Sequence, residues 1–181
     1  MLGEFVEFPP IPRLSRPCII TEKIDGTNGV VAVLEGGVVL AGSRSRWITP
    51  EEDNHGFAKW VKEHEDELRD GLGVGTHFGE WWGRGVNKRY PMIDPKRFSL
   101  FNVHRWRDTR PACCEVVPVL YEGIFTTEAV EQTLLLLEEE GSTAAPGCLK
   151  PEGVVIFHVQ SRLSFKKTIE KDEAPKSVTG L

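Results

Sequence analysis

Long apolar stretches are missing from this chain. Its apolar runs, such as the one from Leu134 to Leu137, are far shorter than the roughly 20 residues that a membrane-spanning helix needs. The first residues, MLGEFVEFPPIPR, carry acidic side chains where a secretion signal has a basic start and an apolar stretch. These absences exclude a membrane-spanning protein and predict a cytoplasmic one that contacts no membrane.

Cysteine and histidine are also sparse. The four cysteines form no C-x-x-C pair, and Cys113 and Cys114 are adjacent, which suits neither a disulfide framework nor a zinc site. The five histidines show no H-x-x-x-H spacing. We therefore expect reduced, structural thiols and no zinc site.

Size and composition are typical of one globular domain spanning residues 1–181, with 40% hydrophobic and 27% charged residues. The net charge of −5 is unevenly distributed. Residues 51–70 contain eight acidic and three basic side chains, whereas residues 84–110 contain eight basic and two acidic ones. The basic segment can attract a polyanion locally. The alternative is an ordinary solvated loop.

Hydrophobic periodicity predicts strands interrupted by two amphipathic helices. One helix is expected over residues 51–70, and the other begins at Thr126 or Thr127 and ends at Gly141. Short runs rich in β-branched residues predict strands at 19–20, 30–34, 38–40, 74–82, 97–106, 116–121, 154–159 and 164–169. Glu35-Gly36-Gly37 predicts a tight hairpin between the second and third of these. The fold class is therefore α+β with largely antiparallel sheets.

The most informative segment is Lys23-Ile24-Asp25-Gly26, a K-x-D-G sequence between a short strand and the hairpin. The turn dipeptides Asp25-Gly26 and Asn28-Gly29 place Lys23 on a short, stiff loop. A lysine held in this way can be a nucleophile, but only as the free amine. Most lysine is protonated at pH 7, so such a role requires a nearby cation or metal.

Further signatures follow this motif in a fixed order, and together they resemble the ATP-dependent RNA ligases common in bacteriophages, within the covalent nucleotidyltransferase superfamily. The resemblance runs from about Glu22 to Lys171. Besides the E-K-I-D-G-T-N string, the matching segments are Ser43-Arg44, Phe78-Gly79-Glu80, Phe98–Val103, Glu152-Gly153-Val154-Val155 and Phe165-Lys166-Lys167-Thr168.

The resemblance implies an adenylyltransferase domain of two antiparallel sheets with flanking helices and ATP in the groove between them. It implies that Lys23 attacks the α-phosphate of ATP and that Glu152 binds Mg²⁺. The residues expected to bind ATP are Glu22, Ile24, Asn28, Arg44, Glu80, Phe101, Val155, Lys166 and Lys167. Arg84, Lys88 and Arg89, in the basic segment, are expected to bind nucleic acid.

The residue types agree with these roles. The planar fork of Arg44 suits phosphate or ribose oxygens, and Phe101 can stack an adenine. Each has a plainer alternative: Glu80 as an outward-facing strand carboxylate, Phe101 as core, and Glu152 as a turn residue. Lys166 and Lys167 cannot face the same side of one strand, and we expect Lys166 to contact the phosphates.

The predicted function is joining of an RNA 5′-phosphate end to a 3′-hydroxyl, through a lysyl-AMP intermediate. The rival hypotheses are a DNA ligase, a capping-type guanylyltransferase on the same scaffold, and a non-catalytic nucleic-acid-binding remnant. About ten residues follow the last predicted strand, so no C-terminal accessory domain is expected. Thr168 stands where the family often has a second lysine.

Overall fold

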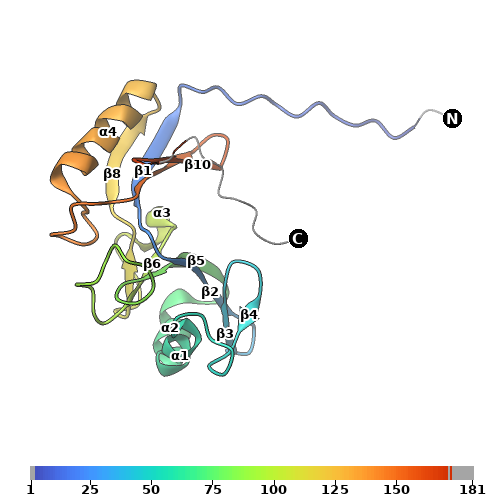
Figure 1. Ribbon diagram of the computed structural model, residues 1–181. Helices are drawn as coiled ribbons and strands as arrows, with labels where there is room; N and C mark the ends of the chain where they lie inside the picture. Colours follow the sequence, from blue (N-terminus) through green and yellow to red (C-terminus); the bar gives the residue numbers. More distant parts are fainter. Residues whose placement is uncertain (1–2, 171, 173–181) are drawn as a thin grey trace.

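The computed structural model describes residues 3–170 and 172, and within them the chain forms two β-sheets (Figure 1). The four-stranded sheet has the order β10-β9-β1-β8, and all its neighbouring strands are antiparallel. Its strands are β1 (Pro17–Lys23), β8 (Val119–Ile124), β9 (Gly153–His158) and β10 (Leu163–Thr168).

The six-stranded sheet has the order β4-β3-β2-β5-β6-β7. Its pairs are antiparallel except for β6 with β7, which are parallel. Its strands are β2 (Thr27–Val33), β3 (Val39–Gly42), β4 (Trp47–Ile48), β5 (Gly75–Trp82), β6 (Arg97–Leu100) and β7 (Cys114–Val116). The predicted α+β class with two largely antiparallel sheets is confirmed.

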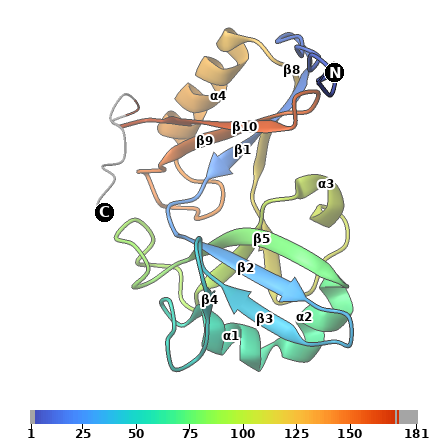
Figure 2. The same cartoon turned by 90° about the vertical axis from the view of Figure 1, so that its right-hand side faces the viewer.

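Helices cover the outer face of each sheet (Figures 1 and 2). α1 (Phe57–Glu63) and α2 (Glu65–Leu72) pack on the six-stranded sheet, and α4 (Thr127–Glu140) packs on the four-stranded one. α3 (Val103–Trp106) is a single turn after β6. The remaining faces of the two sheets point toward the space between them, where a ligand can bind.

Three apolar clusters hold this arrangement together. The first joins α1 and α2 to the six-stranded sheet through Phe57, Leu68 and Phe98, and the second joins α4 to β1 and β9 through Ile20 and Leu137. The third lies where the sheets meet and includes buried residues from both sides, such as Ile19, Trp82 and Tyr90.

The predicted helix over 51–70 is wrong in its extent. Residues 51–56 form turns in which the Asp53 carboxylate accepts hydrogen bonds from the backbone amides of Asn54, Ala58 and Lys59, so α1 begins only at Phe57. At His64 the backbone leaves helical geometry, which divides the segment into α1 and α2. The apolar face that the periodicity predicted is nevertheless the buried one.

Two strand predictions also need correction. The predicted strand 97–106 ends at Leu100, because the Asn102 side chain accepts a hydrogen bond from Arg105 N and starts α3. The predicted strand 116–121 is the end of β7 and the start of β8, separated at Val117-Pro118. The hairpin and the helix that Thr126 caps occur as predicted.

Among the residues that the structure describes, no helix combines the length and the apolar character needed to cross a membrane.

Leu68 and Leu135 provide a matched test of the core. Leu68 in α2 is fully buried, whereas Leu135 in α4 is 55% exposed. Replacing Leu68 with alanine should lower the free energy of unfolding by about 2–5 kcal/mol, because the cavity adds to the lost apolar burial. The control Leu135→Ala should change it by no more than about 0.5 kcal/mol. Urea unfolding followed by circular dichroism measures both, and equal effects would contradict the described packing.

Candidate active site

Lys23 and Glu152 form an ion pair where β1 and β9 meet. β1 ends at Lys23, β9 begins at Gly153, and these two residues are direct partners in the antiparallel ladder. Glu152 therefore lies beside Lys23, with 2.6 Å between Lys23 Nζ and Glu152 Oε2. Both side chains are largely buried, at 18% and 12% exposure. The two groups that the resemblance singled out, 129 residues apart, are in direct contact.

The loop after Lys23 passes close to β5 of the other sheet. A Cβ on Gly26 would lie 2.5 Å from Trp81 O, so only glycine permits this approach. Gly26 N donates a 3.0 Å hydrogen bond to Glu80 Oε1, and Asn28 Nδ2 donates a 3.3 Å hydrogen bond to Glu80 Oε2. Glu80 is thereby attached to the K-x-D-G loop rather than facing solvent.

Glu80 has an unusual electrostatic environment. Burial raises its pKa to about 7, although the nearby Lys23 charge and the Gly26 hydrogen bond act in the opposite direction. The negative charges of Glu152 and Asp25 raise it further. Shifted carboxylates of this kind are common in functional sites.

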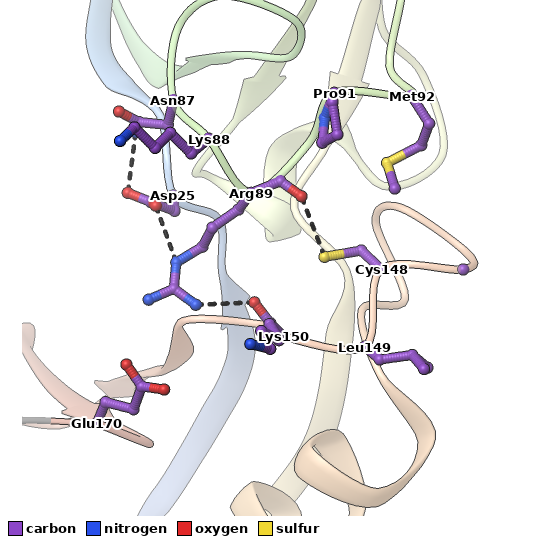
Figure 3. A pocket seen from close by; sticks show the side chains of 11 residues that line it. Asp25, Asn87, Lys88, Arg89, Pro91, Met92, Cys148, Leu149, Lys150 and Glu170 are labelled. Carbon is purple, nitrogen blue, oxygen red and sulfur yellow. Dashed lines mark hydrogen bonds and ion pairs between the residues drawn. The ribbon is translucent and has the colours of Figure 1, made fainter.

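Asp25 connects the K-x-D-G loop to the segment before Glu152 through Arg89 (Figure 3). The Asp25 carboxylate accepts hydrogen bonds from Asn87 Nδ2 and from Arg89 Nε, each 2.9 Å long. Arg89 Nη1 donates a further 2.9 Å hydrogen bond to Lys150 O. Arg89 therefore positions both halves of the site. A cavity of about 740 Å³ opens beside these residues.

A second cavity, of about 480 Å³, lies between the two sheets. Thr21 and Val155 line it from the four-stranded sheet, and Phe101 and Asn102 line it from the other side. Phe101 is 41% exposed, so it is not a core residue. Its exposed ring and the apolar lining suit a flat aromatic ligand.

The ladder between β9 and β10 separates the two neighbouring lysines. Lys166 pairs with Val155, which lines the cavity between the sheets, as does Ser164 two residues earlier. Lys167 instead pairs with Val154, in the cluster beneath α4. Lys166 therefore shares the face of the sheet that carries Lys23.

Two predicted ATP contacts lie in less direct positions. Glu22 is buried, and its carboxylate accepts hydrogen bonds from the Ser142 hydroxyl and from Ala144 N, on the α4 side of β1. Ile24 is buried in the cluster between the sheets. Both side chains support the backbone around Lys23.

Three of the remaining predicted residues are exposed, and the fourth, Arg89, is partly buried. Arg44 is exposed in the turn between β3 and β4. Arg84 forms an ion pair with Asp94 at 3.2 Å, and Lys88 is exposed at the rim of the larger cavity. Arg89, expected to bind nucleic acid, has its guanidinium engaged by protein groups.

The donor set is compatible with magnesium. Glu152 offers a hard carboxylate oxygen, and Mg²⁺ is usually held by one or two carboxylates together with substrate phosphates and water. Within residues 3–170 and 172, no cluster of three or more potential ligand side chains occurs. Glu152 can therefore contribute one carboxylate ligand to a magnesium ion.

Sequence reasoning missed the roles of Asp25, Asn87 and Arg89 in joining the two loops. The sequence contains one signal for these contacts, the aspartate in the K-x-D-G motif. Its carboxylate needs a hydrogen-bonding or charged partner, which the sequence does not identify. The partner, 64 residues away, could not be identified from spacing.

Solved structures of RNA ligases share the fold of this chain. Variants of Naegleria gruberi RNA ligase with ATP and Mn align with TM-scores of 0.63 and 0.64, at 16% and 17% identity, over 85% and 86% of this chain and 50% of theirs. An archaeal ATP-dependent RNA ligase aligns with a TM-score of 0.61 at 16% identity, over 87% of this chain and 48% of that one.

These likenesses show the fold, and the chain spans about half the length of the solved structures it matches. The comparison with curated proteins finds no match. The family model described as RNA ligase matches residues 16–171. This match covers most of the sequence, and with it the chain belongs to the RNA ligase family.

Proposed function

We propose that this protein is an ATP-dependent RNA ligase that works through a lysyl-AMP intermediate on Lys23. The observation that carries the proposal is the contact of 2.6 Å between Lys23 Nζ and Glu152 Oε2, on the face of the four-stranded sheet where Thr21 and Val155 line the cavity of about 480 Å³. Family membership supports the choice of RNA, and the likeness to ligases solved with ATP supports the choice of nucleotide.

In the first step, the Lys23 amine attacks the α-phosphorus of ATP. A nitrogen–phosphorus bond forms, the bond from the α-phosphorus to the bridging oxygen breaks, and pyrophosphate leaves. The amine must first lose a proton, and the Glu152 carboxylate is the hydrogen-bond acceptor in contact with it. Because this ion pair favours the protonated lysine, a cation bound with the nucleotide would be needed to favour the free amine.

The other residues bind and orient the nucleotide. Phe101 stacks the adenine in the cavity between the sheets, where Val155 also lies. Glu80 and Asn28 face the ribose, and Arg44 and Lys166 stabilise charge on the phosphates. A magnesium ion held by Glu152 would neutralise further phosphate charge.

The later steps use the RNA ends. A 5′-phosphate oxygen attacks the phosphorus of lysyl-AMP and releases Lys23, and a 3′-hydroxyl then attacks the activated 5′-phosphate and releases AMP. Catalysis of such transfers depends mainly on positioning and charge neutralisation. Lys88 and Arg84, both exposed, are suited to hold the RNA backbone.

Lys23→Ala should abolish covalent AMP transfer while the fold stays intact, since Lys23 stands at the end of a strand. Lys23→Arg should fail equally, because guanidinium remains protonated and is not a nucleophile. Incubation with α-labelled ATP and Mg²⁺, followed by denaturing electrophoresis, measures the adenylate. Retained labelling in either variant would contradict the assignment.

The same labelling assay separates the rival functions. Labelling by GTP instead of ATP would favour the capping-type reaction, and preferential sealing of nicked DNA would favour a DNA ligase.

Lys166→Ala and Lys167→Ala form a matched pair on one strand. Lys166→Ala should lower the rate of adenylate formation by about 100-fold or more, as loss of a donor to developing charge typically does. Lys167→Ala should stay close to wild type, because its side chain faces α4. Single-turnover adenylation measures both rates, and the opposite order would show that the register is misassigned.

Glu80 should make stability depend on pH. Its pKa is about 7 in the folded protein, whereas the ordinary value for glutamate is 4.5, so the folded state holds an extra proton between these pH values. The free energy of unfolding therefore falls as pH rises through this window, and Glu80→Gln lacks this dependence. Relative to Glu80→Gln, wild type should lose about 2–3 kcal/mol between about pH 5 and pH 8. Urea unfolding of both proteins at several pH values between about 5 and 8 measures the free energy of unfolding. The same pH dependence in wild type and Glu80→Gln would contradict the prediction.

A further inference from the structure

Three aromatic side chains form a row across the inner face of the six-stranded sheet. Trp47 pairs with Gly42, Gly42 with Val30, and Val30 with Phe78, so these positions share one face of the sheet. A 3.0 Å hydrogen bond from Phe101 N to Phe78 O extends the row to Phe101. Asn28 and Glu80, on the same two strands two residues away, lie on this face as well.

Trp47 and Phe78 are unusually exposed for large aromatic side chains, at 57% and 56%. They line a groove of about 360 Å³, together with Val30, Arg46 and Thr76, which we call the aromatic groove. Gly42 makes the groove possible. A Cβ there would lie 3.1 Å from Trp47 Cε3, so the missing side chain leaves room for the indole against the sheet.

The chemistry of the aromatic groove favours a polynucleotide. Arg46 supplies positive charge, and Ser43 and Ser45 supply hydroxyl groups. No acidic side chain is among the lining residues in the described part of the chain. Arg46 contacts Glu52 at 3.5 Å, but both side chains are more than half exposed, so this ion pair contributes little and can exchange for a phosphate.

The aromatic groove is also distinct from the nucleotide cavity. Phe101 lines the cavity between the sheets, whereas Trp47 and Phe78 line the aromatic groove and not that cavity. Phe101 and Phe78 are neighbours in the row, so a strand end held at the nucleotide cavity would continue over Phe78 and Trp47.

We propose that Trp47 and Phe78 each stack a base of the single-stranded RNA segment next to the end being joined, with Arg46 on its backbone. The proposal rests on the proposed function for the identity of the strand. Stacking accepts any base, so the aromatic groove would strengthen binding without selecting a sequence.

The test is the affinity of a short, fluorescently labelled single-stranded RNA, measured by anisotropy. Trp47→Ala and Phe78→Ala should each weaken binding by about 5- to 140-fold, which corresponds to 1–3 kcal/mol per stacked base. Phe165→Ala is the control, because this phenylalanine is 54% exposed but faces the α4 side of the other sheet. Phe78→Tyr should keep RNA binding close to that of wild type. Phe78→Leu should weaken it, because leucine keeps apolar surface but has no π face.

Salt dependence separates stacking from phosphate contact. Trp47→Ala should leave the slope of log affinity against log salt unchanged, whereas Arg46→Ala should reduce it by about 0.7, the value for one phosphate contact to a single strand. An RNA of equal length with abasic positions should bind wild type more weakly, and this difference should shrink in Trp47→Ala and Phe78→Ala.

Adenylate formation without RNA is measured in the same variants and should be unchanged. Normal RNA affinity in the aromatic variants would overturn the proposal and leave the aromatic groove to a protein partner. Loss of adenylation would overturn it too, since the aromatics would then serve ATP or the fold. If wild type formed no adenylate but the variants still lost RNA affinity, the proposed ligase function would fail and the stacking surface would stand.

Discussion

The pairing of β1 with β9 is the constraint on which the candidate site depends. It sets Lys23 opposite Gly153 and so brings Glu152 to the lysine. Gly153 is required there because its φ is 152° and a Cβ would lie 2.2 Å from Lys167 O, on the next strand. The glycine that follows the acidic residue therefore permits the close strand packing that makes the ion pair.

A second constraint ties the two sheets together across the site. The chain leaves β1 at Lys23, touches β5 through Gly26, and enters β2 at Thr27. Arg89 then holds Asp25 and the backbone before Glu152 at once. Because these contacts are charged or made by backbone groups, they fix the loops more firmly than apolar contact alone. The Lys23–Glu152 pair is therefore positioned by both sheets.

Strand alternation assigns neighbouring residues to different tasks. Glu22 and Lys167 face the α4 side, whereas Lys23 and Lys166 face the space between the sheets. The same alternation divides the six-stranded sheet. Phe98 is buried beneath α1, while Phe78 stays exposed on the inner face. The inner faces of the two sheets thus carry Lys23 on one side and the aromatic groove on the other.

Local sequence patterns predicted most of the secondary structure and pointed to Lys23 as the candidate nucleophile. The hairpin at Gly36 and the helix capped by Thr126 follow from short-range chemistry. Lys23, predicted on a loop, is instead the last residue of β1, because it pairs with Gly153 in the ladder. The predictions failed where a side chain overrode the periodicity. Asp53 delays α1, and Asn102 ends β6, because each captures backbone amides that a regular element would have used.

The sequence by itself determined the fold class, the family and the candidate residues, since these depend on spacing, turn chemistry and the order of motifs. Only the tertiary structure decided which of them meet. The pairing of Lys23 with Glu152 and the choice of Lys166 over Lys167 for the inner face depend on strand register, whereas the capture of Asp25 by Arg89 depends on how two loops pack. The Lys23–Glu152 and Asp25–Arg89 contacts join residues more than 60 positions apart, and a shift of one residue in register would reverse every face, so no local pattern contains these contacts.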